Sequence, residues 1–233
     1  MSDFNLHTLF HTLTESNPLT EARLTTGQRQ QLIHLTAQQY QQAQTAMALF
    51  FPEEALTLAV QQQVAFIQAY YQEFEAFCQK QLKFQQPIAE PLWNFWLPLA
   101  FGLKQMRDQQ WDQQRLWIQG IVGLQGTGKT TLACILSWIL QKWGYHCLCL
   151  SLDDLYLPYS DRLALQQEIP YLIWRGPPGT HDVDLGLTLF KALRSQTGQT
   201  GIWVPRFDKS RHGGAGDRGE PESIKHPIDR KST

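Results

Sequence analysis

Residues 123–130 read GLQGTGKT, and this stretch matches every position of the pattern GxxxxGK[ST]. An apolar run over residues 115–122 precedes it, and residues 129–143 follow it with apolar side chains at helical spacing. Strand, glycine-rich turn and helix are the context in which this pattern holds a phosphate, because backbone N–H groups and the helix N-terminus then face the anion. The sequence therefore predicts a nucleotide-binding phosphate loop.

The residue types in this loop suit nucleotide chemistry. Glycines permit the tight turn, Lys129 places a positive charge at the β- and γ-phosphates, and the Thr130 hydroxyl can bind Mg²⁺. We expect ATP and Mg²⁺ as cofactors. The residues predicted to bind the nucleotide are Gly123, Gln125, Gly126, Thr127, Gly128, Lys129, Thr130 and Thr131.

The chain after the phosphate loop indicates an α/β domain. A second apolar run, residues 146–152, follows the predicted helix and ends at a pair of aspartates. Strand, helix and strand with short links form a βαβ unit with parallel strands. Residues 182–193 then have the pattern of a helix, and residues 201–207 that of a strand. We expect a P-loop NTPase-type parallel sheet, with helices on both faces, over residues 111–233.

The residues before this domain favour helices and carry no motif of their own. Apolar side chains recur at helical spacing over residues 25–51 and again over residues 52–77, where a proline followed by a glutamate is a typical helix start. A third helix is expected at residues 91–106. Residues 1–110 are therefore predicted to be an all-α N-terminal region, interpreted most simply as a helical bundle without chemistry.

Composition narrows the classes of partner and location. The 233 residues carry a formal net charge of −1, so no global basic field favours nucleic acid or an anionic membrane. The most apolar stretch, residues 91–103, is shorter than the roughly 20 residues of a membrane span. Four cysteines without paired spacing, and a start that lacks a leader pattern, predict a reducing, cytoplasmic location. We expect a small-molecule substrate as the partner.

The aspartate pair Asp153-Asp154 lies at the carboxyl end of the second predicted strand, where open α/β sheets bind their ligands. An acid there can accept the proton of an attacking hydroxyl or hold Mg²⁺. Asp153, nearer the strand end, is the predicted catalytic residue together with Lys129, and it is a candidate metal ligand together with Thr130. A pair of helix-capping or turn aspartates is the alternative interpretation.

Two later segments add polar residues. Residues 174–182, WRGPPGTHD, form a rigid loop that leads into a predicted helix, and Thr180 or Asp182 could cap that helix. Residues 204–218, VPRFDKSRHGGAGDR, form a basic, glycine-rich loop that suits an anionic substrate or a transferring phosphate. An ordinary solvated surface loop is the structural alternative for the second segment.

The ordered segments GLQGTGKTTL, SLDDLYLP, RGPPGTHD and VPRFDKSRHGGAGDR resemble the D-glycerate 3-kinase family of plants and cyanobacteria. That family belongs to the P-loop small-molecule kinases, with uridine kinase, pantothenate kinase and phosphoribulokinase. The resemblance covers residues 116–218. It implies transfer of the ATP γ-phosphate to the 3-hydroxyl of D-glycerate, giving 3-phosphoglycerate, which is a step of photorespiration in organisms that have it.

The resemblance also implies roles for single residues. The phosphate loop would bind ATP and Mg²⁺, and Asp153 would activate the acceptor hydroxyl. Residues of the two later segments would shape the acceptor pocket or contact the substrate anion. The residues implied to bind the substrate are Asp154, Tyr156, Arg175, His181, Asp182, Arg206, Lys209 and Arg218.

The chain departs from the family pattern after the GDR segment. These kinases continue there into another apolar strand and an acidic Glu-Gly-Trp-like motif, whereas residues 219–233 are polar. We therefore expect a kinase domain that is incomplete at its C-terminus. Two alternatives stay open: a kinase for another small alcohol, such as pantothenate, uridine or a pentose phosphate, and a truncated nucleotide-binding module without activity.

Overall fold

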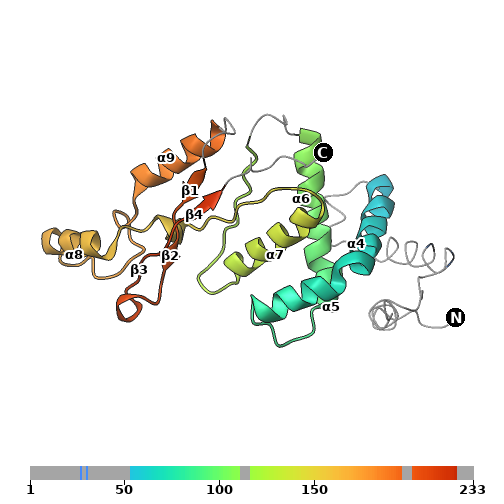
Figure 1. The fold of residues 1–233 in the computed structure, drawn as a ribbon, viewed down its shortest axis with the longest axis horizontal. Coiled ribbons are helices and arrows are strands. Elements are labelled where there is room, and N and C mark those ends of the chain that lie inside the picture. The colour runs from blue at the N-terminus through green and yellow to red at the C-terminus, as the bar shows by residue number, and fades with distance from the viewer. Residues whose placement is uncertain (1–26, 28–29, 31–52, 111–115, 196–200, 225–233) are drawn as a thin grey trace. The chain divides into compact units, whose positions relative to one another are not determined.

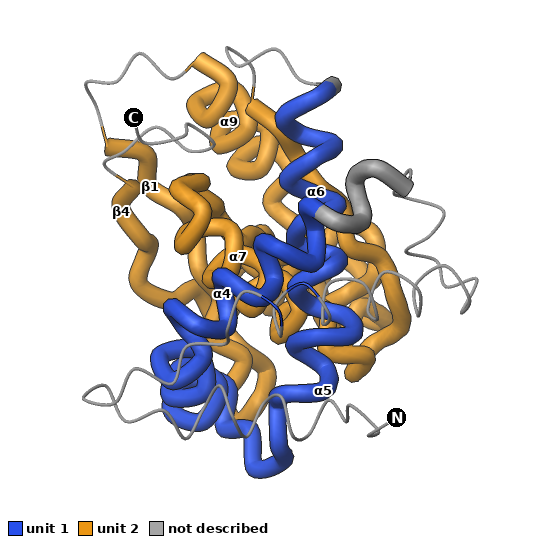
Figure 2. The backbone as a smooth tube through the Cα atoms, turned by 90° about the vertical axis from the view of Figure 1, so that its right-hand side faces the viewer, with its two compact units in different colours: residues 1–110 blue, residues 111–233 orange. Residues whose placement is uncertain are grey.

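The chain divides into two compact units, residues 1–110 and residues 111–233, which Figure 2 shows in different colours. The structure is a computed structural model. The helix predicted for residues 25–51 falls almost entirely outside the residues that it describes, which are 27, 30, 53–110, 116–195 and 201–224.

Two long helices form the described part of the first unit (Figure 1). Helix α4 (Glu53–Lys80) confirms the helix expected from residue 52 onward. After a loop, the short α5 (Ala89–Pro91) and a π-helical turn, η1 (Leu92–Trp96), lead into α6 (Leu97–Gln110). This second stretch confirms the helix expected at residues 91–106.

The apolar stripe of α4 supplies much of the core of the first unit. Val60, Val64 and Phe74 have spacings that place them on the same face of the helix, and each is at most 1% exposed. The ring of Phe74 meets that of Trp96 edge to face, with centroids 5.9 Å apart. Phe101 of α6 is also fully buried. Close-packed aromatic rings therefore hold these helices together.

Three α-helices belong to the described part of the second unit. Helices α7 (Lys129–Lys142) and α9 (Val183–Arg194) confirm the helices predicted from apolar spacing after the phosphate loop and after residue 182. Helix α8 (Tyr159–Glu168) was not predicted. A turn of 3₁₀ helix, η2 (Leu152–Leu155), contains the aspartate pair.

The strands of the second unit form one interrupted hairpin over residues 202–224 (Figure 1). Strand β1 (Ile202–Val204) pairs antiparallel with β4 (Glu222–Ile224), and β2 (Phe207–Asp208) pairs antiparallel with β3 (Asp217–Arg218). Between the two ladders, the Gly219 N–H donates to the Arg206 carbonyl at 2.7 Å and continues the pairing. The basic glycine-rich segment is therefore the distal part of a hairpin, whose tip includes the 3₁₀ turn η3 (His212–Gly214).

The predicted parallel sheet is not found among the described residues. Residues 116–122 and 146–151 contain no strand there, and the strand expected at residues 201–207 pairs antiparallel with its own hairpin partner. A hairpin closes a short loop, whereas parallel pairing needs a long crossover and costs more chain entropy. The described architecture therefore combines helices with small antiparallel sheets.

Parts of the two segments predicted as strands pack against the core, although Ile118 and Val122 of the first segment are exposed. Leu189 and Leu193 of α9 and Val204 of β1 form a buried cluster. Partly buried apolar side chains from both segments, and from the hairpin, lie against this cluster: Leu116, Leu148, Leu150, Phe190, Ile202 and Ile224. The chain therefore reaches η2 with its apolar side chains beside α9, and this brings the aspartate pair next to β2.

Candidate active site

The phosphate loop, residues 123–130, is an exposed turn that leads directly into α7. Gly128 precedes the helix with φ 79°, a left-handed conformation that a residue with a side chain rarely adopts. The Lys129 ammonium donates to the Leu124 carbonyl at 2.6 Å, and the Thr127 hydroxyl donates to the same oxygen at 2.8 Å. The lysine charge is thus folded back over the turn.

The aspartate turn η2 is built on a capping box. The Ser151 hydroxyl accepts the Asp153 N–H at 3.2 Å, and the Asp154 carboxylate accepts the Ser151 N–H at 3.0 Å. The second oxygen of Asp154 accepts the Phe207 N–H at 3.2 Å, from the hairpin. With its side chain only 14% exposed, Asp154 fixes both the turn and the hairpin beside it.

Arg206 completes the surroundings of Asp154. Its guanidinium donates to the Asp154 carboxylate at 3.2 Å and to the Cys149 carbonyl at 2.9 Å, and it also pairs with Glu222 on β4. Burial favours a lower pKa for Arg206, but the two carboxylates outweigh it and the pKa lies above its ordinary value. The described bonds of Arg206, which was predicted to bind substrate, therefore stabilise the fold.

Asp153 has different surroundings. Its carboxylate meets the Lys209 ammonium, with Nζ and Oδ2 2.5 Å apart, and its side chain is 35% exposed. Burial raises the pKa of Asp153, but the bonds from Lys209 and Tyr156 and the charge of Arg175 outweigh it, so the pKa lies below its ordinary value. Asp153 is therefore ionised at neutral pH and partly exposed, so it can accept a proton from a hydroxyl that comes within hydrogen-bond reach.

The loop before α9 joins the same region. Asp182 caps α9 by accepting the Leu185 N–H at 2.9 Å, and the Arg218 guanidinium binds its other oxygen at 2.6 Å. The hydrogen bond from the Leu185 N–H lowers the pKa of Asp182 most. Burial raises this pKa and Arg218 lowers it further, so the pKa lies below its ordinary value. Next to this pair, the rings of Tyr156 and His181 stack with centroids 4.4 Å apart.

Arg175, whose predicted role is to bind substrate, contacts the hairpin tip. Its guanidinium donates to the carbonyls of Gly214, at 2.7 Å, and Ala215, at 2.9 Å. Thr180, one of the two capping candidates, does not cap α9. Its hydroxyl donates to the Pro177 carbonyl at 2.7 Å and closes the loop on itself.

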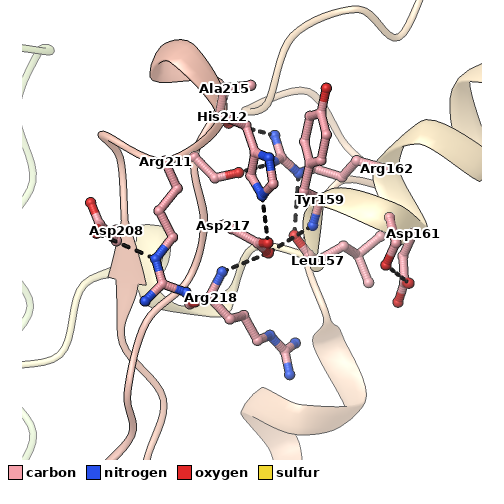
Figure 3. A network of polar contacts seen from close by, with 12 residues as sticks. Leu157, Tyr159, Asp161, Arg162, Asp208, Arg211, His212, Ala215, Asp217 and Arg218 are labelled. Atoms are coloured by element: carbon pink, nitrogen blue, oxygen red, sulfur yellow. Dashed lines mark hydrogen bonds and ion pairs between the residues drawn. The ribbon is translucent and has the colours of Figure 1, made fainter.

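Two residues that the sequence did not single out hold the hairpin tip against α8 (Figure 3). The Arg162 guanidinium donates to the carbonyls of Ala215, at 2.9 Å, and of Gly216, and its Nε donates to the Leu157 carbonyl at 3.2 Å. Pro158, followed by an acidic residue in the next turn, is a helix-start signal that would have located α8, but not the role of Arg162.

The second of these residues is Asp217. Its carboxylate accepts the first backbone N–H of α8, from Tyr159, at 2.8 Å and meets the His212 ring nitrogen at 3.0 Å, and the Tyr159 and His212 rings stack (Figure 3). The Tyr159 N–H is the main reason why the pKa of Asp217 lies below its ordinary value, and it outweighs the opposing effect of burial. Arg162 and Asp217 together connect the tip to α8.

The structure therefore brings the acceptor-side residues together, and no hydrogen bond described for these residues joins them to the phosphate loop. The pairs that it forms are Asp153 with Lys209, Asp154 with Arg206, Tyr156 with His181, and Asp182 with Arg218. Among the described hydrogen bonds, those of the phosphate loop stay within the loop and the first turn of α7. The roles of these residues stay predictions.

Two further properties concern metals and membranes. Within the described ranges, no three His, Cys, Asp or Glu side chains form a group that could hold a metal ion. Thr130 and Asp153 offer the oxygen donors that Mg²⁺ prefers, and they stay predicted ligands. The helices that the structure describes include none with the length and apolarity to cross a membrane.

Curated proteins with similar sequences are named as kinases. An uncharacterized kinase of Schizosaccharomyces pombe, mug58, is 34% identical over 134 residues, which are 56% of this chain and 48% of its own. The chloroplastic D-glycerate 3-kinase of Arabidopsis thaliana is 28% identical over 150 residues, 60% of this chain and 33% of its own. The chain thus spans about half of one relative and a third of the other.

A solved structure of a D-glycerate 3-kinase from Cryptococcus neoformans is 29% identical, covers 56% of this chain and 47% of its own chain, and gives a TM-score of 0.44. No family model matches the chain. The homologues of this chain include a D-glycerate 3-kinase, so the resemblance that the motif order predicts is confirmed.

Proposed function

We propose that the chain carries the active site of an ATP-dependent phosphotransferase that converts D-glycerate to 3-phosphoglycerate. The observation that carries this proposal is the ionised, solvent-accessible Asp153 beside Lys209, downstream of a complete phosphate-loop motif. The D-glycerate 3-kinase among the relatives supports the identity of the acceptor, and both kinases support the reaction type.

The phosphate loop binds the triphosphate of ATP in this proposal. The Lys129 ammonium exchanges its bond to the Leu124 carbonyl for the β- and γ-phosphate oxygens, which carry more negative charge. Thr130 and Asp153 would hold Mg²⁺, which neutralises charge on the phosphates when bound. The helix α7 presents its positive end to the same anion.

The acceptor side then performs the proton transfer. The 3-hydroxyl of glycerate donates a hydrogen bond to the Asp153 carboxylate, and its oxygen attacks the γ-phosphorus. A new O–P bond forms while the bond between the γ-phosphorus and the β–γ bridging oxygen breaks. ADP leaves with that electron pair, and the hydroxyl proton passes to Asp153.

An ADP-release assay tests this function. The 233-residue chain is supplied with ATP, Mg²⁺ and, in separate reactions, D-glycerate, pantothenate, uridine or ribulose 5-phosphate. We expect turnover above the ATPase background with D-glycerate only. Preferred turnover of another acceptor would contradict the assignment of glycerate.

Lys129→Ala in the same assay tests the nucleotide side. The substitution removes the main cation at the transferring phosphate, so we expect turnover to be lost, whereas Lys142→Ala at the far end of α7 should retain it. Turnover that survives Lys129→Ala would disprove the phosphate-loop assignment.

A further inference from the structure

We infer that Lys209 is the residue that binds the acceptor's carboxylate, and that its contact with Asp153 restricts the acceptor to short hydroxy acids. This inference rests on the proposed function, because it takes Asp153 as the group that receives the acceptor hydroxyl. It adds the chemical class of acceptor and separates Lys209 from the other basic residues around the site.

The other cations near Asp153 already have partners that hold the fold. Arg206 is bound by Asp154, Glu222 and a backbone carbonyl. Arg218 is bound by Asp182, and Arg175 by carbonyls of the hairpin tip. A substrate anion bound by one of these arginines would share a guanidinium that already holds the hairpin against the rest of the unit.

Lys209 can bind an anion at less cost. Its side chain is 59% exposed, and the contact that the structure describes for its ammonium is the 2.5 Å pair with Asp153. An ammonium group has three N–H donors, so one bond to Asp153 leaves two donors for a second oxyanion. Lys209 can therefore hold an acceptor carboxylate while it stays beside the base.

The short distance within this pair limits the size of the acceptor. A hydroxyl bonded to Asp153 and a carboxylate bonded to Lys209 are held no more than about 8 Å apart, since each joins the pair by one ordinary hydrogen bond. In glycerate, two carbons separate the 3-hydroxyl oxygen from the carboxyl carbon, so glycerate fits easily within this distance. Extended pantothenate separates its terminal hydroxyl and carboxylate by more than this, so it would have to bind in a folded conformation, and uridine has no anionic group.

Binding measurements on Lys209 variants test the inference without turnover. Calorimetry on the 233-residue chain compares D-glycerate with D-glyceramide, in which a neutral amide replaces the carboxylate. In Lys209→Met we expect D-glycerate affinity to fall at least about tenfold, because a charged hydrogen bond is lost, with D-glyceramide affinity little changed. Lys209→Arg should recover part of the loss, and Lys191→Met on the exposed side of α9 should behave as the unmodified chain.

The outcomes separate this inference from the proposed function. Undiminished D-glycerate binding in Lys209→Met would overturn the inference, and so would an unmodified chain that binds neither D-glycerate nor 3-hydroxypropionate. Lys209-dependent binding of 3-hydroxypropionate without binding of D-glycerate would support the inference and reject glycerate as the acceptor. Lys209-dependent binding of D-glycerate without transfer from ATP would support the inference and reject the proposed function.

Discussion

Asp153 and Asp154 are neighbours in the chain, yet their carboxylates meet different surroundings. Asp154 accepts bonds from two backbone N–H groups and from Arg206, and it is largely buried. Asp153 is more exposed and meets Lys209. The difference follows from the turn η2, which directs the first carboxylate outward and uses the second to close its own capping box. Spacing alone did not say which aspartate is the base. Asp153 was the better candidate only because it lies nearest the predicted strand end, and the structural bonds of Asp154 were not predicted.

Single substitutions at the two aspartates should separate activity from stability. Asp153→Asn removes the proposed base, so we expect kcat to fall about 10²- to 10⁴-fold while stability changes by at most about 1 kcal/mol. Asp154→Asn places amide hydrogens against the donors that the carboxylate now accepts, so we expect a loss of about 2 kcal/mol in the free energy of unfolding. Steady-state kinetics and urea denaturation measure the two effects. A stable Asp154→Asn protein with kcat as low as that of Asp153→Asn would reverse the assignment.

Gly216 lies near the hairpin tip, next to the ring of Phe207. It has φ 75°, and a Cβ added there would lie 2.5 Å from the Phe207 ring. Gly214, two residues earlier, has φ 94° with open space around the same position. Both glycines therefore need a left-handed backbone conformation, but a side chain would meet the Phe207 ring only at Gly216.

Alanine at these two positions should measure the contact with the ring. Gly214→Ala carries the strain of a left-handed residue alone, about 1–2 kcal/mol of unfolding free energy. Gly216→Ala adds the displacement of Phe207, so we expect a further loss of about 1–3 kcal/mol. Thermal denaturation of the two variants measures the difference. Equal losses would show that the ring moves aside without cost.

At the scale of elements, the hairpin positions Lys209, and contacts with α8 hold the tip of the hairpin in place. Arg162 makes three bonds with backbone carbonyls, two of them on the tip, and its guanidinium lies 5.6 Å from the centres of the Tyr159 and Phe207 rings. An arginine is suited to this position because its planar group presents several donors at once, whereas a lysine presents a point charge.

Trypsin should report how firmly α8 holds the tip. In Arg162→Ala we expect cleavage after Lys209 and Arg211 to become several times faster, because the Gly216 carbonyl loses its bond to Arg162 and Ala215 keeps only its bond from Arg175, which loosens the tip. Arg162→Lys should give an intermediate rate, and Arg194→Ala at the exposed end of α9 should give that of the unmodified chain. Mass spectrometry of timed digests measures the rates. An unchanged rate in Arg162→Ala would mean that the hairpin holds its own shape.

The elements differ in how far the sequence could predict them. Helices α4, α7 and α9 each carry an apolar stripe, and local spacing is enough to locate them. The pairing of residues 201–207 depends on which distant segment supplies the partner, and spacing within the strand carries no such information. Arg162 and Asp217 also act through contacts between residues more than fifty positions apart, so no local pattern indicates them.

At the scale of the molecule, the second unit depends on ionised aspartates. Asp153, Asp182 and Asp217 each accept bonds from cations or backbone N–H groups, and each has a pKa below its ordinary value. They join η2, α9, α8 and the hairpin. Within the described residues no strand is longer than three residues, so these carboxylates are important connections between the elements.

Acid should therefore loosen the second unit, and Asp217 shows the sign of the effect. Its folded-state pKa lies below the unfolded value of about 3.9, so its stabilisation is complete above that value and is lost as the pH falls through the folded pKa. Asp217→Asn should cost about 1 kcal/mol at pH 7, and the gap to the unmodified chain should shrink towards pH 3. Urea denaturation across pH 3–7 measures this gap, with Asp184→Asn on the exposed side of α9 as the control. A gap that stays constant over this range would show that Asp217 contributes through shape, and not through its charge.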